Sequence, residues 1–545
     1  MVALEVDTTT IVLGSLVVLV LALKLYLRPP PPQLHPFLLG RQSTPAPTRN
    51  AGESPVYSSA ANGGIRPGYR PDRGIRTLAD ALANSGSVVE GTSKGTWAKG
   101  GDKVAALVDA LRAGLLAKLN GVEGKVLVSV SDPTDSLLVS LALATSPLKP
   151  VVLAPGSALP SGLSFTASIQ SADGSLTSSD VPLDAGAKTI LLGEEFKDEA
   201  YEILASGKTK TVEAAAAEPS DVALTIISEG IALDITHQNL TSSLVSWLAL
   251  FPASPQQTRP TIRDFVISFH HPATPYGFGL ALLILYQSAS LSFLTLPAEP
   301  PATPDEITEL FATKDAPPAT LVFAPTKVLG QPLYTAILQQ MLGDASFIVQ
   351  YARNGKLRLL REGTVSKQTM WDSLLFKGIR KDLNLTRLRA LVLAGPLEQS
   401  RLETFRVALG CPTLSTLEHP LLLAPLSAAN MWDVQRLPPP GVKGINGREK
   451  GHVGPPGAGI EVKLRGEEGD MEAGRFRGEI LVRTPTLPSP ASLPASLLLA
   501  DSSLPPLPAY PGKPAPAPNE ALKWLRTGVR AEMAPEGVLW LVEEK

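Results

Sequence analysis

The sequence predicts an α/β fold in which strands alternate with helices. Residues 103–121 place apolar side chains at the spacing of an amphipathic helix. An apolar run at 126–130 then fits a buried strand, residues 134–144 fit a second helix, and residues 151–153 fit another strand. Because strands and helices that alternate in this way are joined by crossover connections, we expect α/β sheets at the centre of the molecule.

The composition is that of a globular protein with two or more domains. Of the 545 residues, 44% are hydrophobic and 18% are charged, which argues against a largely disordered chain. A formal net charge of −2 gives no reason to expect nucleic acid, or anionic lipid, as a partner of the chain as a whole. The only cysteine, Cys411, excludes an internal disulfide, and with 6 histidines the sequence presents no metal-ligand cluster.

An apolar stretch at residues 10–27 has the length of a membrane-spanning helix, with Lys24 as its only charge. A buried first helix is the alternative, but a proline run follows, and we predict a single transmembrane helix in residues 1–28. Acidic residues precede the stretch and Arg28 follows it, which argues against a cleaved signal peptide and places the main domain in the cytosol. We expect the endoplasmic reticulum membrane, with the mitochondrial outer membrane or the peroxisome as alternatives.

The next segment, residues 29–94, is rich in Pro, Gly, Ser and Arg, and we expect a linker on the domain surface. Within the α/β region predicted at 95–450, residues 157–184 are rich in Ser and Gly and predict a loop-bearing insertion, followed by a strand at 189–192.

Residues 221–251 predict a strand, a tight turn, a second strand and a capped helix. An apolar run at 222–227 leads into a polar turn at 228–230, after which alternating residues suit a strand with one buried face. Thr236 stands where a helix N-cap belongs, because apolar residues recur at helical spacing behind it.

A second long apolar stretch covers residues 278–296. Taken alone it could cross a membrane. Gln287 and three serines in its second half instead favour a buried helix followed by a strand at 291–296.

Several motifs occur in the order and at the intervals of one protein family. Thr236, His237 and Asn239 match Thr-His-x-Asn, and residues 388–397 match a strand that ends in Gly-Gly-Ala-Pro-Leu. Four further motifs lie at 451–456, 460–464, 477–483 and 524–528. Together they resemble the adenylate-forming (AMP-binding) superfamily of acyl-CoA synthetases and luciferases. Residues 35–41 and 52–54 resemble a segment of fungal long-chain acyl-CoA synthetases.

The resemblance covers most of residues 95–545. It implies the large N-terminal domain of the adenylate-forming fold, with two α/β subdomains in residues 95–450. A β-rich subdomain is expected at 451–545, with a Pro-rich insertion at 484–518. The last residues, up to Lys545, resemble the run before the family's hinge, so the mobile C-terminal domain is expected to be absent, or lost by truncation of the sequence.

The resemblance also implies a phosphate-binding loop, which is degenerate here. Such a loop holds the β- and γ-phosphates of ATP with backbone N–H groups and a Lys. This chain is about five residues too short for it, and a carboxylate stands where phosphate would bind. The residues that occupy the region are Ser228, Glu229, Gly230, Thr236 and His237.

In the nucleotide cleft, the resemblance places Leu417 at the aromatic that stacks on adenine and Leu421 at the Mg²⁺ ligand. A shifted alignment makes Glu418 the metal ligand instead. Val529 stands at the Asp that binds the ribose hydroxyls. The other nucleotide-cleft candidates are Gly395, Pro396, Thr527 and Gly528.

For the acyl cleft the resemblance selects His270, Tyr276, Gly277 and Gly279. The alternative for His270 is an ordinary histidine at a strand end.

The leading hypothesis is a membrane-anchored, catalytically impaired relative of long-chain acyl-CoA synthetases. It would bind an acyl or nucleotide ligand, or act as a partner of an active synthetase. The competing hypothesis is an active fatty acid–CoA ligase that uses ATP, Mg²⁺ and CoA, with Ser228, Thr236 and Glu418 at the phosphates and the metal. A third is a membrane scaffold that uses the anchor and the Pro-rich insertion.

Overall fold

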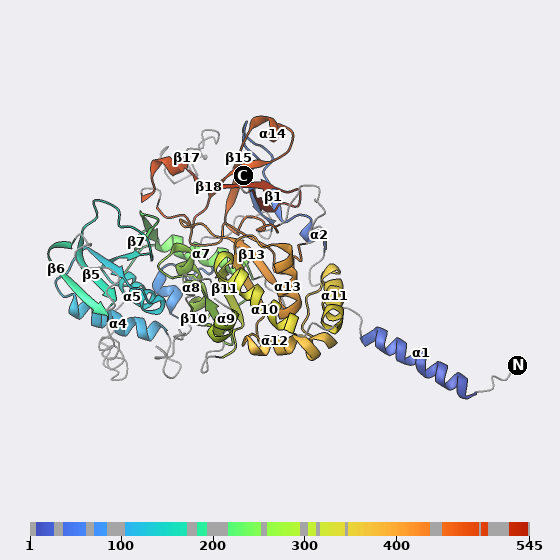
Figure 1. Cartoon of the computed structure of the whole chain (residues 1–545). Coiled ribbons are helices and arrows are strands. Elements are labelled where there is room, and N and C mark those ends of the chain that lie inside the picture. Colours follow the sequence, from blue (N-terminus) through green and yellow to red (C-terminus); the bar gives the residue numbers. More distant parts are fainter. Residues whose placement is uncertain are drawn as a thin grey trace.

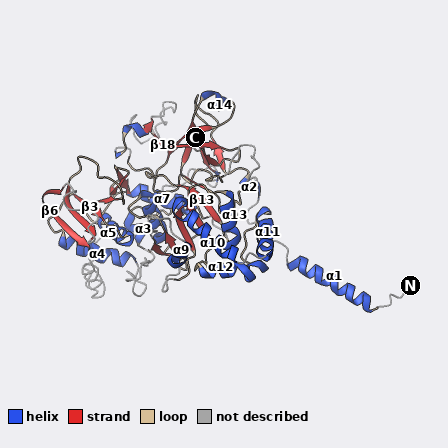
Figure 2. Ribbon diagram, in the orientation of Figure 1, coloured by secondary structure: helices blue, strands red, loops and turns tan. Residues whose placement is uncertain are grey.

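The described residues form three sheets with their helices, and one N-terminal helix that extends away from them (Figure 1). Helices surround two of the sheets, whereas the region around the C-terminal end consists mainly of strands and loops (Figure 2). The computed structural model describes residues 7–26, 36–60, 70–83, 85, 104–171, 183–192, 216–251, 259–294, 304–311, 317–343, 347–435, 450–489, 492–499 and 523–542.

Sheet 1 has the strand order β6-β5-β3-β4-β7-β8, with parallel neighbours except for the antiparallel pair β7–β8. Its central strands are buried almost throughout, as strands covered on both faces are, which explains their uninterrupted apolar runs. The strands are β3 (Lys125–Ser129), β4 (Lys149–Leu153), β5 (Phe165–Ser171), β6 (Leu183–Leu192), β7 (Val222–Ser228) and β8 (Ile231–Thr236). Helices α4 (Val104–Lys118) and α5 (Pro133–Ala144) confirm the predicted alternation.

The loop-bearing insertion predicted at 157–184 is confirmed at 157–164 and wrong at 165–171, where β5 pairs with β3. Its buried polar residues caused the error. Ser168 and Gln170 are buried, and their side chains hydrogen-bond within the sheet, Gln170 Nε2 to Ser168 Oγ at 3.3 Å and Ser168 Oγ to Thr189 Oγ1 at 3.2 Å. A strand can bury such groups when they are hydrogen-bonded.

Sheet 2 has the order β10-β9-β11-β12-β13-β14, parallel except for β13–β14. Its strands are β9 (Phe265–Ser268), β10 (Ser290–Phe293), β11 (Leu321–Pro325), β12 (Ala390–Ala394), β13 (Thr413–Leu417) and β14 (Ser427–Ala428). Helix α8 (Pro275–Tyr286) is buried and leads to β10, which confirms the buried helix and strand predicted for the second apolar stretch.

One hydrophobic core contains residues of sheets 1 and 2 and of the helices α7 (His237–Ala249) and α8. Trp247 of α7 illustrates the junction. Its ring lies 5.0 Å from the ring of Tyr276 on α8 and 6.1 Å from that of Phe323 on β11. The two α/β units are therefore joined through α7 and α8 by aromatic contacts.

Sheet 3 is antiparallel, with the order β1-β2-β15-β16-β18-β17 and β19 paired to β18. It is the predicted β-rich region, but it also takes two strands from the segment expected to be a linker, residues 29–94. Its strands are β1 (Ser43–Pro45), β2 (Tyr57–Ser59), β15 (Glu461–Arg465), β16 (Arg477–Arg483), β17 (Leu498–Leu499), β18 (Trp524–Met533) and β19 (Leu539–Leu541).

The expected linker also contributes α3 (Leu78–Leu82), whose apolar residues belong to the core of sheets 1 and 2. Short elements in a Pro- and Gly-rich segment carry too few residues for a periodic pattern, so the sequence did not reveal them. Residues 490–491 and 500–518 of the Pro-rich insertion predicted at 484–518 lie outside the described residues, as do residues 519–522 and 543–545.

The N-terminal stretch forms helix α1 (Thr8–Tyr26), but the predicted transmembrane helix is not supported. Three threonines form its first turn, which leaves an apolar part shorter than the roughly 20 residues that a bilayer crossing requires. Among the described residues, no helix has both the length and the apolar character for such a crossing.

The remaining helical elements mostly flank sheet 2. They are α2 (Pro36–Leu39), α9 (Pro304–Phe311), η2 (Thr326–Gly330), α10 (Gln331–Gly343), α11 (Phe347–Arg361), η3 (Asp372–Phe376), α12 (Lys377–Asp382), α13 (Gln399–Leu409), α14 (Glu468–Glu472) and η5 (Ala495–Leu497). Of these, η2 and η3 are π-helical turns.

Candidate functional site

Polar residues gather where adjacent parallel strands of sheet 2 end. His270 follows β9, Thr326 follows β11, Gly395 follows β12 and Glu418 follows β13. Because the carboxyl ends of parallel strands meet at one edge of a sheet, the side chains lie close together. This edge is the usual ligand position in open α/β sheets.

Four side chains form what we call the strand-end cluster: His270, Tyr276, Thr416 and Glu418. His270 Nδ1 lies 3.2 Å from Glu418 Oε2, and the His270 ring centroid lies 4.7 Å from that of Tyr276. The Tyr276 hydroxyl lies 3.1 Å from Thr416 Oγ1. The structure therefore brings together His270, Tyr276 and Glu418, which the sequence assigned to different parts of the cleft.

Burial differs sharply within the strand-end cluster. The side chain of His270 is 5% exposed, whereas that of Glu418 is 39% exposed, so Glu418 is the member that solvent reaches best. Burial raises the pKa of Tyr276 well above its usual range, and the charge of Glu418 raises it further. Tyr276 consequently stays a neutral hydroxyl at all physiological pH values.

Thr326 completes this edge of the sheet and was not selected from the sequence. Its hydroxyl donates to the carbonyl of Gly395 at 3.1 Å. Gly395 has φ +123°, and a Cβ there would lie 3.1 Å from Thr326 Cβ, so the position favours glycine. Thr326 opens the π-helical turn η2, a type of turn that often occurs at functional sites. Its place directly after a buried strand was the available signal.

The predicted phosphate-loop region is a two-residue hairpin. Ser228 of β7 pairs with Ile231 of β8, and between them Glu229 and Gly230 have φ values of 49° and 75°. Two consecutive positive φ values identify a type I′ turn, the usual turn of short hairpins. The tight turn expected from the sequence is therefore confirmed.

The two other residues of that region have structural partners. Thr236 caps α7 in a capping box with Asn239, whose backbone N–H donates to Thr236 Oγ1 at 3.1 Å. His237 is buried and its Nδ1 accepts a hydrogen bond from the backbone N–H of Leu78 at 3.1 Å. Burial lowers the pKa of His237, so the ring is neutral near pH 7.

Leu417, Leu421 and Val529 belong to one apolar cluster that also contains Leu233 of β8 and residues of sheet 3. Leu417 and Leu421 are buried, and Val529 packs against the cluster partly buried. The positions that the resemblance assigned to adenine, metal and ribose thus carry hydrophobic side chains at the contact between sheet 3 and the hairpin.

His419 links this contact to β18. Its Nδ1 accepts from the backbone N–H of Leu421 at 3.3 Å, and its Nε2 lies 3.3 Å from the carbonyl of Thr527. Burial lowers the pKa of His419, so a neutral ring that donates from Nε2 satisfies both contacts. Thr527 Oγ1 donates to the Ile480 carbonyl at 2.8 Å, and the Gly528 N–H donates to Glu479 Oε1 at 3.3 Å.

The two glycines predicted for the acyl cleft lie against backbone. A Cβ on Gly277 would lie 2.1 Å from the carbonyl oxygen of His271, and one on Gly279 would lie 1.9 Å from that of Leu423. The Leu423 carbonyl also accepts a hydrogen bond from Trp247 Nε1 at 2.9 Å. Close packing of α8 therefore accounts for both glycines.

The residues present do not fit a bound triphosphate with its cation. Within the described ranges, no group of three or more His, Cys, Asp or Glu is placed to hold a metal ion. Glu418 is a single carboxylate beside His270, whereas Mg²⁺ binding to ATP enzymes uses carboxylates together with phosphate oxygens. The hairpin offers the Glu229 carboxylate instead of a row of backbone N–H groups and a Lys.

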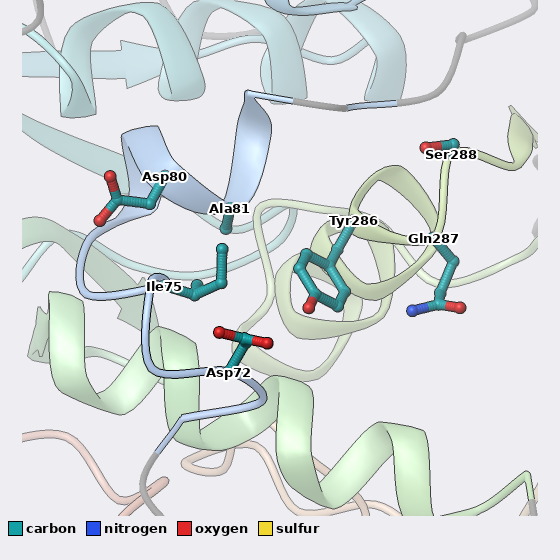
Figure 3. Close-up of a pocket in the computed structure, with 7 residues that line it drawn as sticks. All are labelled: Asp72, Ile75, Asp80, Ala81, Tyr286, Gln287 and Ser288. Atoms are coloured by element: carbon teal, nitrogen blue, oxygen red, sulfur yellow. The ribbon is translucent and has the colours of Figure 1, made fainter. Parts of the chain in front are cut away.

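A separate pocket of about 350 Å³ lies between the α3 region and the end of α8 (Figure 3). Its lining residues are Asp72, Ile75, Asp80, Ala81, Tyr286, Gln287 and Ser288. None of them belongs to the strand-end cluster. The carboxylate of Asp80 accepts from the backbone N–H groups of Arg76 and Thr77, at 2.9 and 2.8 Å, and so serves the local turn.

The sequence matches no family model and no curated protein. Solved structures do match the fold. A long-chain-fatty-acid-CoA ligase from Archaeoglobus fulgidus is similar with a TM-score of 0.57 and 14% identity, over 88% of this chain and 86% of that chain. The N-terminal domain of a protein called FACL13 from Mycobacterium tuberculosis matches with a TM-score of 0.53 and 12% identity, over 86% of this chain and 100% of that domain.

A nonribosomal peptide synthetase in an AMPPNP-bound form is also similar, with a TM-score of 0.56 and 12% identity. The match covers 89% of this chain and 44% of that one. At these identities the likeness concerns the fold alone. The chain has the mixed α/β fold of the N-terminal domain of adenylate-forming enzymes.

Proposed function

We propose that this chain is a long-chain acyl-CoA synthetase-like protein that does not catalyse adenylation. It binds an acyl or nucleotide ligand, or regulates lipid activation as the partner of an active synthetase. The observation that carries the proposal is the type I′ turn of Glu229 and Gly230, which stands where the fold would place a phosphate-binding loop.

The physical argument concerns the triphosphate. Adenylation requires the β- and γ-phosphates to be held while pyrophosphate leaves, and cradles of backbone N–H groups do this by supplying donors and positive potential. A two-residue turn has no such row of donors, and a carboxylate near a phosphate is repulsive without an intervening cation. The apolar surroundings of Leu417 and Val529 support the same conclusion for adenine and ribose.

The strand-end cluster supports retained ligand binding. It keeps a neutral Tyr276 hydroxyl, the His270 ring and the Thr416 hydroxyl at the sheet edge where such folds bind ligands. Thermal shift separates a binder from a scaffold. We expect palmitoyl-CoA to raise the melting temperature of the wild-type protein, and a Tyr276→Phe variant to show a smaller shift.

An active fatty acid–CoA ligase is the second candidate. The observation in its favour is the partly exposed carboxylate of Glu418, next to His270 at the ends of the strands. In this case Glu418 would hold Mg²⁺, and Ser228 and Thr236 would face the phosphates of ATP, with CoA as the acceptor.

AMP release tests the two candidates against each other. The purified full-length chain is incubated with ATP, Mg²⁺, palmitate and CoA, with an active ligase as the positive control. We expect no AMP above the rate without enzyme, and no change in a Glu418→Gln variant. AMP release that requires palmitate and that Glu418→Gln abolishes would establish the ligase instead.

A further inference from the structure

An apolar surface, largely exposed, lies on α11, on residues 370–371 and on the π-helical turn η3 that follows them. We call its six residues the aromatic patch: Phe347, Ile348, Tyr351, Met370, Trp371 and Leu374. The side chain of Phe347 is 83% exposed and that of Leu374 is 65% exposed. Helix α11 forms an outer edge of the body in Figure 1. Contiguous exposed side chains of this size mark an interaction site more often than single exposed ones do.

The rings of the patch are in mutual contact. Phe347 and Tyr351 stack with their centroids 6.3 Å apart, and Tyr351 meets Trp371 edge-on at 5.6 Å. Gly355 leaves room for this arrangement, because a Cβ there would lie 3.2 Å from Trp371 Nε1. The three rings therefore form one connected surface across α11 and the start of η3.

A buried ion cluster fixes the two elements relative to each other. Asp372 Oδ1 on η3 lies 2.8 Å from Lys356 Nζ on α11 and 2.7 Å from Arg380 Nη1 on α12. The side chains of all three residues are buried, so removing one would leave charge without its partner. The patch is thus held in shape by the interior beneath it.

The exposed face of α11 changes from aromatic to basic along its length. Phe347, Tyr351, Arg358 and Arg361 are spaced i, i+4, i+11 and i+14, which places them on one stripe of the helix. The opposite stripe carries the buried Ala352, Lys356 and Leu360. Exposed lysines, Lys377 and Lys381, continue the basic character one and two turns beyond Leu374.

The local charge is opposite to that of the chain. Residues 347–382 contain eight Lys or Arg and three Asp or Glu; without the buried Lys356, Arg380 and Asp372, six basic and two acidic residues leave a net charge of +4, whereas the whole chain carries −2. Aromatic and leucine side chains next to Lys and Arg are typical of protein surfaces that lie in the headgroup region of a bilayer. Each cation near an anionic membrane adds to the attraction between the protein and the bilayer surface.

We propose that this face binds the surface of an anionic lipid bilayer. Phe347, Tyr351 and Leu374 enter the boundary between headgroups and acyl chains, and Arg358, Lys377 and Lys381 contact lipid phosphates. The contact lies in the plane of the interface and requires no helix to cross the bilayer.

Vesicle co-sedimentation tests the lipid requirement. The full chain is mixed with phosphatidylcholine vesicles that contain or lack phosphatidylserine. We expect a double variant Phe347→Ser, Leu374→Ser and a charge reversal Arg358→Glu, Lys381→Glu each to weaken binding to the phosphatidylserine vesicles by about tenfold or more. Ile262→Ser with Arg263→Glu, a matched exposed apolar and basic pair outside the patch, should bind as the wild type does.

A local probe separates the patch from any other membrane contact of the chain. Ser373 is exposed within the patch segment, and the native Cys411 is buried, so a Ser373→Cys variant accepts an environment-sensitive dye selectively. We expect a blue shift with phosphatidylserine vesicles, and none for the same dye at Arg263→Cys. Vesicle binding without a shift at position 373 would overturn the proposal. The proposal would also be overturned if the patch variants bound vesicles as the wild type does but no longer formed oligomers at high protein concentration. The patch would then be an interface between copies of the chain.

Discussion

At the scale of single residues, glycine at position 279 is dictated by another part of the backbone. A Cβ there would meet the Leu423 carbonyl, which also accepts the Trp247 indole N–H. We expect Gly279→Ala to lower the free energy of unfolding by about 2–3 kcal/mol, because neither the carbonyl nor the buried helix can move away. Urea unfolding followed by far-UV circular dichroism measures the effect.

The matched control is Gly378→Ala on α12, where a Cβ meets nothing within 4 Å. Alanine there should leave stability unchanged or raise it by up to about 1 kcal/mol through helix propensity. If the two variants changed the free energy of unfolding by the same amount, the close approach of α8 to Leu423 would not be the reason for glycine at position 279.

Individual site residues were only partly predictable from the sequence. His270, Tyr276 and Glu418 stand in recognisable motifs, so the sequence identified them. Their mutual contact across sheet 2 was not visible, because it depends on which strands are neighbours. Thr326 and Thr416 were missed for the same reason: each is an ordinary strand-end residue until β11, β12 and β13 are placed side by side.

At the scale of elements, the β7–β8 hairpin has a turn residue that is unfavourable for its backbone. Glu229 has φ 49°, a region in which Asn is tolerated far better than Glu. We expect Glu229→Asn to raise the free energy of unfolding by about 0.5–1 kcal/mol and Gly230→Ala to lower it by about 1 kcal/mol. Urea melts in which neither substitution changes the free energy of unfolding would fit a flexible loop rather than this turn.

The N-terminus of α7 gives a second prediction at this scale. Asn239 closes the capping box, and its Nδ2 also donates to the carbonyls of Pro485 and Leu487, both at 2.8 Å. Asn239→Ala should therefore cost more stability than Thr236→Ala, about 2 kcal/mol against about 1. Urea unfolding of the two single variants measures both costs. If the two substitutions lowered the free energy of unfolding equally, the hydrogen bonds from Asn239 to Pro485 and Leu487 would contribute nothing to stability.

Elements were predictable where the pattern was local and long enough. The hairpin, the cap at Thr236, and helices α4, α5 and α8 follow from apolar spacing and turn residues. Strand β5 was missed because Ser168 and Gln170 are polar yet buried, and β1 and β2 because three residues carry no period. Pairing with other strands, of β5 with β3 and of β2 with β15, stabilises them, and this pairing is not visible in the sequence.

At the scale of the whole molecule, buried neutral histidines set the response to acid. Burial lowers the pKa values of His237, His271 and His419 below the 6.5 of the unfolded chain. The unfolded state therefore binds more protons as the pH falls below 6.5, and the stability that these groups contribute is lost on the way down to their native pKa values. We expect the melting temperature to fall between pH 7 and about pH 5.

The buried carboxylate of Asp433 does not change this fall of melting temperature between pH 7 and about pH 5. Burial raises the pKa of Asp433, but the hydrogen bond and charge of His452, with hydrogen bonds from Gln42 and Gln435, hold it at about 2, so the contribution of Asp433 to stability is constant until far lower pH. A His419→Gln variant, which can keep a donor and an acceptor, should show a shallower fall of melting temperature with acid. An unchanged slope would exclude His419 as a contributor.

The fold as a whole was predictable because ordered motifs in the second half of the chain identify it, whereas the proposed loss of adenylation rests on a few atoms in one turn. The most direct measurement compares the binding of ATP and AMP to the purified chain by isothermal titration calorimetry in the presence of Mg²⁺. We expect ATP to bind no more tightly than AMP, because its β- and γ-phosphates meet a hairpin turn and the Glu229 carboxylate. A Mg²⁺-dependent affinity for ATP more than about tenfold above that for AMP, or about 1.4 kcal/mol, would contradict this account.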